Sequence, residues 1–119
     1  MPVFRGEIYF VSLDPVIGRG SGGGKSRPVV VLSINDINNK PLVVTVVPGT
    51  SAGAKPAHYK NVVLVPPTPR NGLRTDTIFQ CHQLRAIDKA RIMSPPIGRL
   101  SNEHLQQIED STRYCLGLF

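Results

Sequence analysis

The sequence predicts a mainly β protein: a small half-open barrel that carries one α-helix at its C-terminus. Two observations predict this fold class. Short runs rich in β-branched residues are separated by proline and glycine turns, and helical periodicity is confined to the end of the chain. A chain of 119 residues is long enough for one modest core but not for two, so we expect a single domain over residues 1–119.

The first strand is expected at residues 6–13, where the pair Asp14-Pro15 closes the run. This run has apolar side chains on both faces, which is typical of a strand covered on both sides. One face carries Ile8 and Phe10, and the other carries Tyr9, Val11 and Leu13.

Four more strands are expected downstream. Runs 28–34 and 42–47 are β-branched, and the polar segment 35–41 between them predicts a hairpin. A short strand is expected at 61–65, where a proline-rich segment stops it, and a fifth strand at 75–84.

The secondary structure of the next segment is ambiguous, and the end of the chain is then predicted to be helical. Residues 85–100 show no clear periodicity apart from a single turn at 88–91. Ser101 then can cap a helix. One helical stripe carries Leu105, Ile108, Thr112, Cys115 and Leu116. We therefore expect an amphipathic C-terminal helix that packs on the sheet.

The chain is basic. Fourteen Lys and Arg against eight Asp and Glu leave a net charge of +6, and the pI is about 9.8. This balance favours polyanionic partners, namely nucleic acid, an acidic protein or a membrane surface. Charge alone does not choose among them.

Cysteine usage and hydropathy indicate an intracellular protein. Cys81 and Cys115 form no CxxC motif and have no His/Cys ligand spacing, so we expect reduced thiols, no metal and no cofactor. The first residues have no apolar signal-peptide core, and no run approaches the roughly 18 apolar residues of a membrane span. We expect a soluble cytoplasmic protein that does not bind a membrane.

A glycine-rich segment, GRGSGGGKSRP at residues 18–28, links the first two strands. Glycines let the backbone approach a ligand closely, and Arg19, Lys25 and Arg27 supply charge, so a phosphate is the natural ligand. A nucleotide-binding P-loop does not fit, because Arg19 stands where its first glycine belongs and a β-branched run follows instead of a helix. The plainer alternative is a surface loop without function.

Several ordered motifs resemble the MazF/PemK-type toxins of bacterial toxin-antitoxin pairs. The motifs are RGEIYFVSLDP (5–15), RPVVVLS (27–33), VVPGTS (46–51) and CHQLRAIDK (81–89) with IGRLS (97–101). The resemblance covers essentially the whole chain. It implies an SH3-like barrel, a symmetric homodimer, and a metal-independent endoribonuclease that cuts single-stranded mRNA at short sequences. The implied partner is a MazE-like antitoxin with an acidic, flexible tail.

Two other classes stay open at this stage. A gyrase-directed toxin of the same fold would act on a protein and would need neither Arg27 nor Thr50. A non-catalytic SH3-like binding module would also fit the basic charge and the small barrel.

The resemblance places Arg27 and Thr50 at the catalytic centre. The planar guanidinium of Arg27 can hold two phosphate oxygens, and the Thr50 hydroxyl can donate to a phosphate oxygen or orient the attacking group. For Arg27 the alternative is an ion pair with a carboxylate such as Asp14. For Thr50 it is a role in a turn.

His82 is a third catalytic candidate, because some relatives carry an acidic residue there that is proposed as the general base. An imidazole could do that work near neutral pH, or it could stack or pack instead. Gln80 replaces an arginine of some relatives, so their acid and base assignments do not transfer. RNA contacts are expected from Arg19, Lys25, Ser51, Gln83 and Arg85. The base-stacking candidates Phe10, Tyr59 and Phe79 are not separable by sequence.

Overall fold

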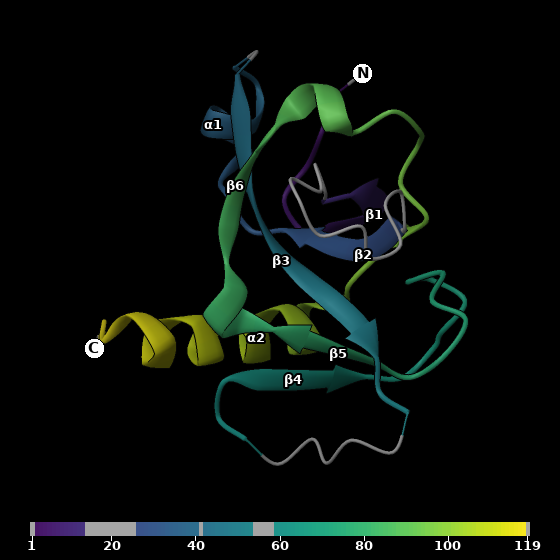
Figure 1. Ribbon diagram of the computed structural model, residues 1–119, viewed down its shortest axis with the longest axis vertical. Coiled ribbons are helices and arrows are strands. Elements are labelled where there is room, and N and C mark those ends of the chain that lie inside the picture. The colour runs from purple at the N-terminus through teal and green to yellow at the C-terminus, as the bar shows by residue number, and fades with distance from the viewer. Residues whose placement is uncertain (1, 14–25, 41, 54–58, 119) are drawn as a thin grey trace, which may run out of the picture.

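The computed structural model describes residues 2–13, 26–40, 42–53 and 59–118 (Figure 1). These residues form one curled, seven-stranded sheet and a C-terminal helix that lies across it. The strands are β1 (Glu7–Ser12), β2 (Ser26–Val31), β3 (Val43–Ser51), β4 (Val62–Val65), β5 (Thr77–Gln80), β6 (Arg85–Asp88) and β7 (Gly98–Arg99). The helices are α1 (Asn35–Asn38) and α2 (Asn102–Leu116), with 3₁₀ turns η1 (Cys81–Gln83) and η2 (Lys89–Arg91).

The long strand β3 joins the two halves of the sheet. The strand order is β4-β5-β3-β2-β1-β7, and β6 also pairs with β3. Residues 43–48 of β3 pair with β6 and β2, whereas its last residues, from Gly49, pair with β5. All pairings are antiparallel. Since one strand serves both halves, the sheet curls into a half-barrel, which confirms the predicted fold class.

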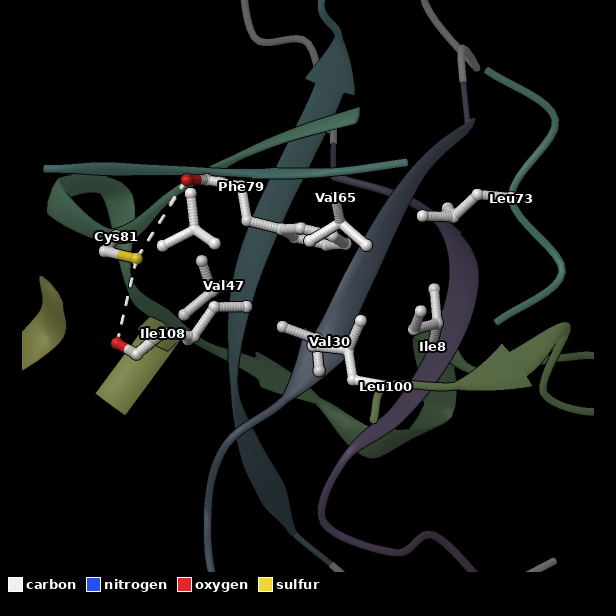
Figure 2. Packing of buried hydrophobic residues seen from close by; sticks show 10 residues of the cluster. Ile8, Val30, Val47, Val65, Leu73, Phe79, Cys81, Leu100 and Ile108 are labelled. Carbon is white, nitrogen blue, oxygen red and sulfur yellow. Dashed lines mark hydrogen bonds between the residues drawn. The ribbon is translucent and has the colours of Figure 1, made fainter. Parts of the chain in front are cut away.

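The curled sheet encloses a hydrophobic core on each face. The core between the sheet and α2 includes Ile8, Val30, Val47, Phe79 and Ile108 (Figure 2). The core on the other face includes Tyr9, Val29, Val44, Val46 and Ile87. The prediction that the first strand is covered on both sides is therefore confirmed for most of its residues. The exception is Phe10, whose side chain is 38% exposed.

Helix α2 begins where the sequence predicts, after Ser101, and it ends at Leu116. The Ser101 hydroxyl accepts a hydrogen bond from the His104 amide at 3.1 Å, and Gly117 ends the helix in the left-handed conformation. Leu105, Ile108, Thr112 and Cys115 are buried or half-buried. Leu116, which we expected on the same stripe, is exposed because the last turn of α2 runs past the ends of β4 and β5 (Figure 1).

The expected strand boundaries needed correction at the corners of the sheet. The predicted fifth strand at 75–84 is only β5, because the chain turns through η1 at Cys81 and leaves as β6 to pair with the other half of β3. Strand β3 continues to Ser51, beyond the predicted end at residue 47. The β2–β3 hairpin is confirmed, with α1 in its connection, and the turn at 88–91 is η2.

Both cysteines are free thiols. Burial raises the pKa of the Cys81 thiol, which lies in the core beside Ile108 (Figure 2). Among the described helices, none combines the length and the apolar composition that a membrane crossing requires.

Candidate active site

Strand register brings polar residues together at one end of the sheet. Residues that face each other across antiparallel strands point to the same side, and every second residue continues that side. The face that carries the Tyr9 core continues on β1 to Leu13, on β2 to Arg27, on β3 to Pro48 and Thr50, and on β6 to Arg85. An apolar face therefore ends in a polar cluster, Arg27, Thr50 and Arg85, that comes from three strands.

A hollow of about 350 Å³ lies at this end of the sheet, and we call it the cationic hollow. Its lining residues are Leu13, Arg27, Pro48, Thr50, Gln80, Gln83 and Arg85. Four residues that the sequence analysis singled out for catalysis or RNA contact thus meet in one place.

A second hollow, of about 290 Å³, lies beside the first, and we call it the aromatic hollow. Its lining residues are Phe10, Ser26, Arg27, Pro28, Gly49, Thr50 and Ser51. Arg27 and Thr50 line both hollows, so they stand on the wall that the two hollows share. The predicted RNA contact Ser51 belongs to the aromatic hollow.

The guanidinium of Arg27 is available to a ligand. The residue is exposed, and within the described part of the chain it has no hydrogen-bond or ion-pair partner. Its alternative partner Asp14 lies outside the described residues. Arg85 makes one long hydrogen bond to the Leu13 carbonyl, at 3.5 Å. Because the lining contains two guanidiniums and no carboxylate, it favours an anion.

Thr50 is held in place by the close approach of β3 to β5. A Cβ atom on Gly49 would lie 2.8 Å from the Thr77 methyl group and 3.1 Å from the Phe79 ring, so only glycine allows this spacing. Thr50 itself pairs with Ile78 of β5 and is half-buried. Among the described residues its hydroxyl has no partner, which leaves it free to donate to a phosphate oxygen.

His82 lies on η1, is exposed, and lines neither hollow. Its Nδ1 atom is 2.8 Å from the Asn61 amide nitrogen, and Nδ1 accepts a hydrogen bond from this amide when the ring carries its proton on Nε2. The next residue of η1, Gln83, lines the cationic hollow. The catalytic role of His82 stays a prediction.

The structure separates the three aromatic candidates. Phe79 is fully buried in the core, Tyr59 is exposed but lines neither hollow, and Phe10 lines the aromatic hollow. Leu13 and Pro48 also line the site, and sequence reasoning missed both; the register of β1 and β3 was the signal that places them. The predicted contacts Arg19 and Lys25 lie outside the described residues.

Two other features bear on the choice of site. A larger hollow of about 490 Å³ between β4 and α2 contains Lys60 beside the Tyr114 ring, with the nitrogen 5.5 Å from the ring centroid, but none of the residues predicted to be functional. In the described ranges, no three His, Cys, Asp or Glu residues lie close enough to hold a metal ion together.

Fold and site together define a small basic β half-barrel with a hollow at one end of its sheet whose lining includes two guanidinium groups. Residues 4–116 match the family model described as the PemK-like, MazF-like toxin of type II toxin-antitoxin systems, and the chain belongs to this family.

Named relatives cover nearly the whole chain. The chain is 40% identical to "Endoribonuclease MazF9" of Mycobacterium tuberculosis, over 97% of each protein. It is 32% identical to "Endoribonuclease EndoA" of Bacillus subtilis, over 99% of this chain and 97% of that protein. Among solved structures, an endoribonuclease in complex with its cognate antitoxin, from a mycobacterial species, superposes with a TM-score of 0.76 at 19% identity, covering 98% of this chain and 97% of that one.

Proposed function

We propose that the protein is the toxin of a type II toxin-antitoxin pair and acts as an endoribonuclease that cuts single-stranded RNA at short sequences without a metal ion. Family membership and the relatives named as endoribonucleases support the activity. The observation that carries the proposal is the shared wall: Arg27 and Thr50, which come from separate motifs, line both hollows with no described partner.

The reaction uses the RNA's own 2′-hydroxyl. The 2′-oxygen loses its proton and attacks the adjacent phosphorus, and the bond from phosphorus to the 5′-oxygen of the next nucleotide breaks. The products are a 2′,3′-cyclic phosphate and a 5′-hydroxyl, once the leaving oxygen has taken up a proton. This chemistry requires a proton acceptor, a proton donor and positive charge around phosphorus.

We assign these roles from the lining of the site. Arg27 holds the non-bridging phosphate oxygens and stabilises the charge that develops on them, and Thr50 donates a hydrogen bond to the same group. Arg85 pairs with a neighbouring phosphate, and Gln83 contacts a base edge. His82 is the candidate for proton transfer. To accept a proton at Nδ1 it must release the Asn61 amide, so substrate binding would have to break that bond.

Further proposals concern the partner and the assembly. An acidic, flexible antitoxin segment would compete with RNA for the cationic hollow, where Arg27 and Arg85 offer complementary charge. We also propose that the protein is a homodimer and works in the cytoplasm, where its substrate is found.

Incubation of the protein with single-stranded RNA in excess EDTA tests the activity. We expect cleavage that leaves 5′-hydroxyl ends, and sequencing of those ends gives the recognised bases. An all-deoxy strand of the same sequence should stay intact, and Arg27→Ala protein purified in parallel controls for a contaminating nuclease. Strict dependence on added magnesium would contradict the metal-independent mechanism. No cleavage at all would contradict the activity and favour a binding module or a protein-directed toxin.

A further inference from the structure

The aromatic hollow has the lining of a nucleobase subsite. Phe10 lies on β1 between Tyr9 and Val11, which are both buried, yet its own side chain is 38% exposed. Its backbone is paired with that of Pro28 on β2, so the ring stands on a rigid part of the sheet. An exposed aromatic ring on a rigid strand is a platform on which an unpaired base can stack.

The lining of this hollow also contains polar groups. Ser26 and Ser51 line the hollow and are exposed, and each hydroxyl can both donate and accept. The Ser51 hydroxyl has only a long contact, 3.5 Å, to the Thr75 hydroxyl. Such groups suit the hydrogen-bonding edge of a base that lies flat on an apolar surface.

The aromatic hollow lies next to the position at which we expect the reacting phosphate. Arg27 and Thr50 belong to the linings of both hollows, although the strand register places Phe10, with Pro28 and Gly49, on the opposite face of the strands from them. A phosphate held by both residues therefore lies at the end of the sheet where the two linings meet. A nucleotide chain that passes over this end directs the nucleosides on the two sides of the phosphate toward the two hollows. The cationic hollow has polar and charged groups for one of them, and the aromatic hollow has Phe10 for the other.

We propose that the aromatic hollow binds the base of a nucleotide adjacent to the scissile phosphate by stacking it on Phe10. This inference rests on the proposed ribonuclease function and extends it to a specific subsite. Neither other aromatic candidate competes for the role, because Phe79 is buried and Tyr59 does not line either hollow. Stacking contributes affinity with little base preference, so discrimination at this nucleotide comes from the Ser26 and Ser51 hydroxyls.

Binding of uncleavable RNA tests the subsite. The probe is the mapped target RNA with a single 2′-deoxynucleotide at the cut position, together with versions that lack one base on either side of the cut. We expect Phe10→Leu to weaken binding of the intact probe about tenfold or more, as loss of a base–aromatic stack does. Removal of one adjacent base should weaken binding to the wild-type protein equally, and the two losses should not add.

Matched variants separate stacking from general damage. Phe4→Leu removes a ring of similar exposure, 41%, that lines neither hollow, and it should leave binding unchanged. Phe10→Tyr keeps an aromatic ring and should bind within about twofold of the wild type. Unchanged binding by Phe10→Leu, or losses that add in full, would overturn the inference.

A crosslinking measurement needs no variant and decides the case if Phe10→Leu does not fold. 5-Iodouridine is placed next to the cut on either side in turn, and irradiation should attach one of these positions to Phe10 of the wild-type protein. No attachment to Phe10 from either position would overturn the subsite. If the wild-type protein cuts RNA while these results are negative, the proposed function stands and only the subsite fails; if it cuts no RNA, the proposed function itself fails.

Discussion

At the scale of single residues, two of the proposed catalytic side chains, those of Arg27 and Thr50, form no ion pair or side-chain hydrogen bond with other described residues. Polar side chains that line two hollows and have no partner among the described residues are typical of a site that binds a substrate and catalyses its reaction.

We predict that Arg27→Ala and Thr50→Ala each lower the rate of RNA cleavage by about 10² or more, as removal of a positioned charge stabiliser does. Both residues lie at the end of the polar cluster rather than in a core, so thermal unfolding should change little. Arg74→Ala is the matched control, since it removes one exposed positive charge that lines neither hollow. Full activity in Arg27→Ala, or an unfolded variant, would assign Arg27 a structural role instead.

For His82, the prediction concerns proton transfer. If its imidazole takes or gives a proton, the pH–rate profile of the wild-type protein contains an ionisation that the profile of His82→Asn lacks. Asn61→Ala is informative beside it, because loss of the Asn61 hydrogen bond should alter that ionisation without removing it. A His82→Asn variant with the wild-type rate and profile would make His82 a binding or packing residue.

At the scale of elements, β3 is the strand on which the site depends. It contributes Pro48 and Thr50 to the cationic hollow, and it passes from the β6–β2 half of the sheet to the β5 half at Gly49. The position of Thr50 is therefore tied to the spacing between β3 and β5.

We predict that Gly49→Ala destabilises the protein by about 1–3 kcal/mol, because the added methyl group would overlap the Thr77 methyl and crowd the buried Phe79 ring. Cleavage should fall as well, since relief of the overlap moves β3 and Thr50 away from β5. Urea unfolding measures the first effect and an RNA cleavage assay measures the second.

Thr77→Ser supplies the control for this overlap. It removes the methyl group and retains the hydroxyl that bonds to the Thr75 carbonyl at 3.1 Å. In a double-mutant cycle, Thr77→Ser should recover part of the stability that Gly49→Ala loses. Losses that simply add would show that the contact with Thr77 does not limit the spacing.

At the scale of the whole molecule, charge and assembly govern the interaction with partners. The chain carries a net charge of +6, and part of that charge lies at the cationic hollow through Arg27 and Arg85. An acidic segment and an RNA strand present the same kind of charge to this surface, so we expect one binding event to exclude the other.

We predict that the protein sediments as a homodimer and that an acidic antitoxin segment displaces uncleavable RNA from it in a competition titration. Displacement should weaken as salt rises, because screening reduces the attraction between exposed charges. A peptide in which Asn and Gln replace the Asp and Glu residues is the control and should displace little. A stable active monomer, or an antitoxin that binds without releasing RNA, would contradict this arrangement.

Local patterns in the sequence predicted most of the elements. Short apolar and β-branched runs bounded by turn residues identified the strands around Ile8 and Val30, and a capping serine with an apolar stripe identified α2 from Ser101 onward. The corner at Cys81 was missed, because a continuous β-type run contains no local signal that the chain must turn there to pair with β3.

The sequence by itself determined the fold class, the charge, and the motifs that contain Arg27 and Thr50. These properties depend only on composition and on residues that are neighbours along the chain. Only the tertiary structure decided which residues meet: that Gln83 and Arg85 join Arg27, that His82 lies outside both hollows, and that Phe10 rather than Phe79 faces a ligand. The physical reason is that the alternation of side chains along a strand determines which residues share a face of that strand. Which strands pair with one another depends on residues far apart in the sequence: β1, β2, β3 and β6 pair so that both hydrophobic cores become buried.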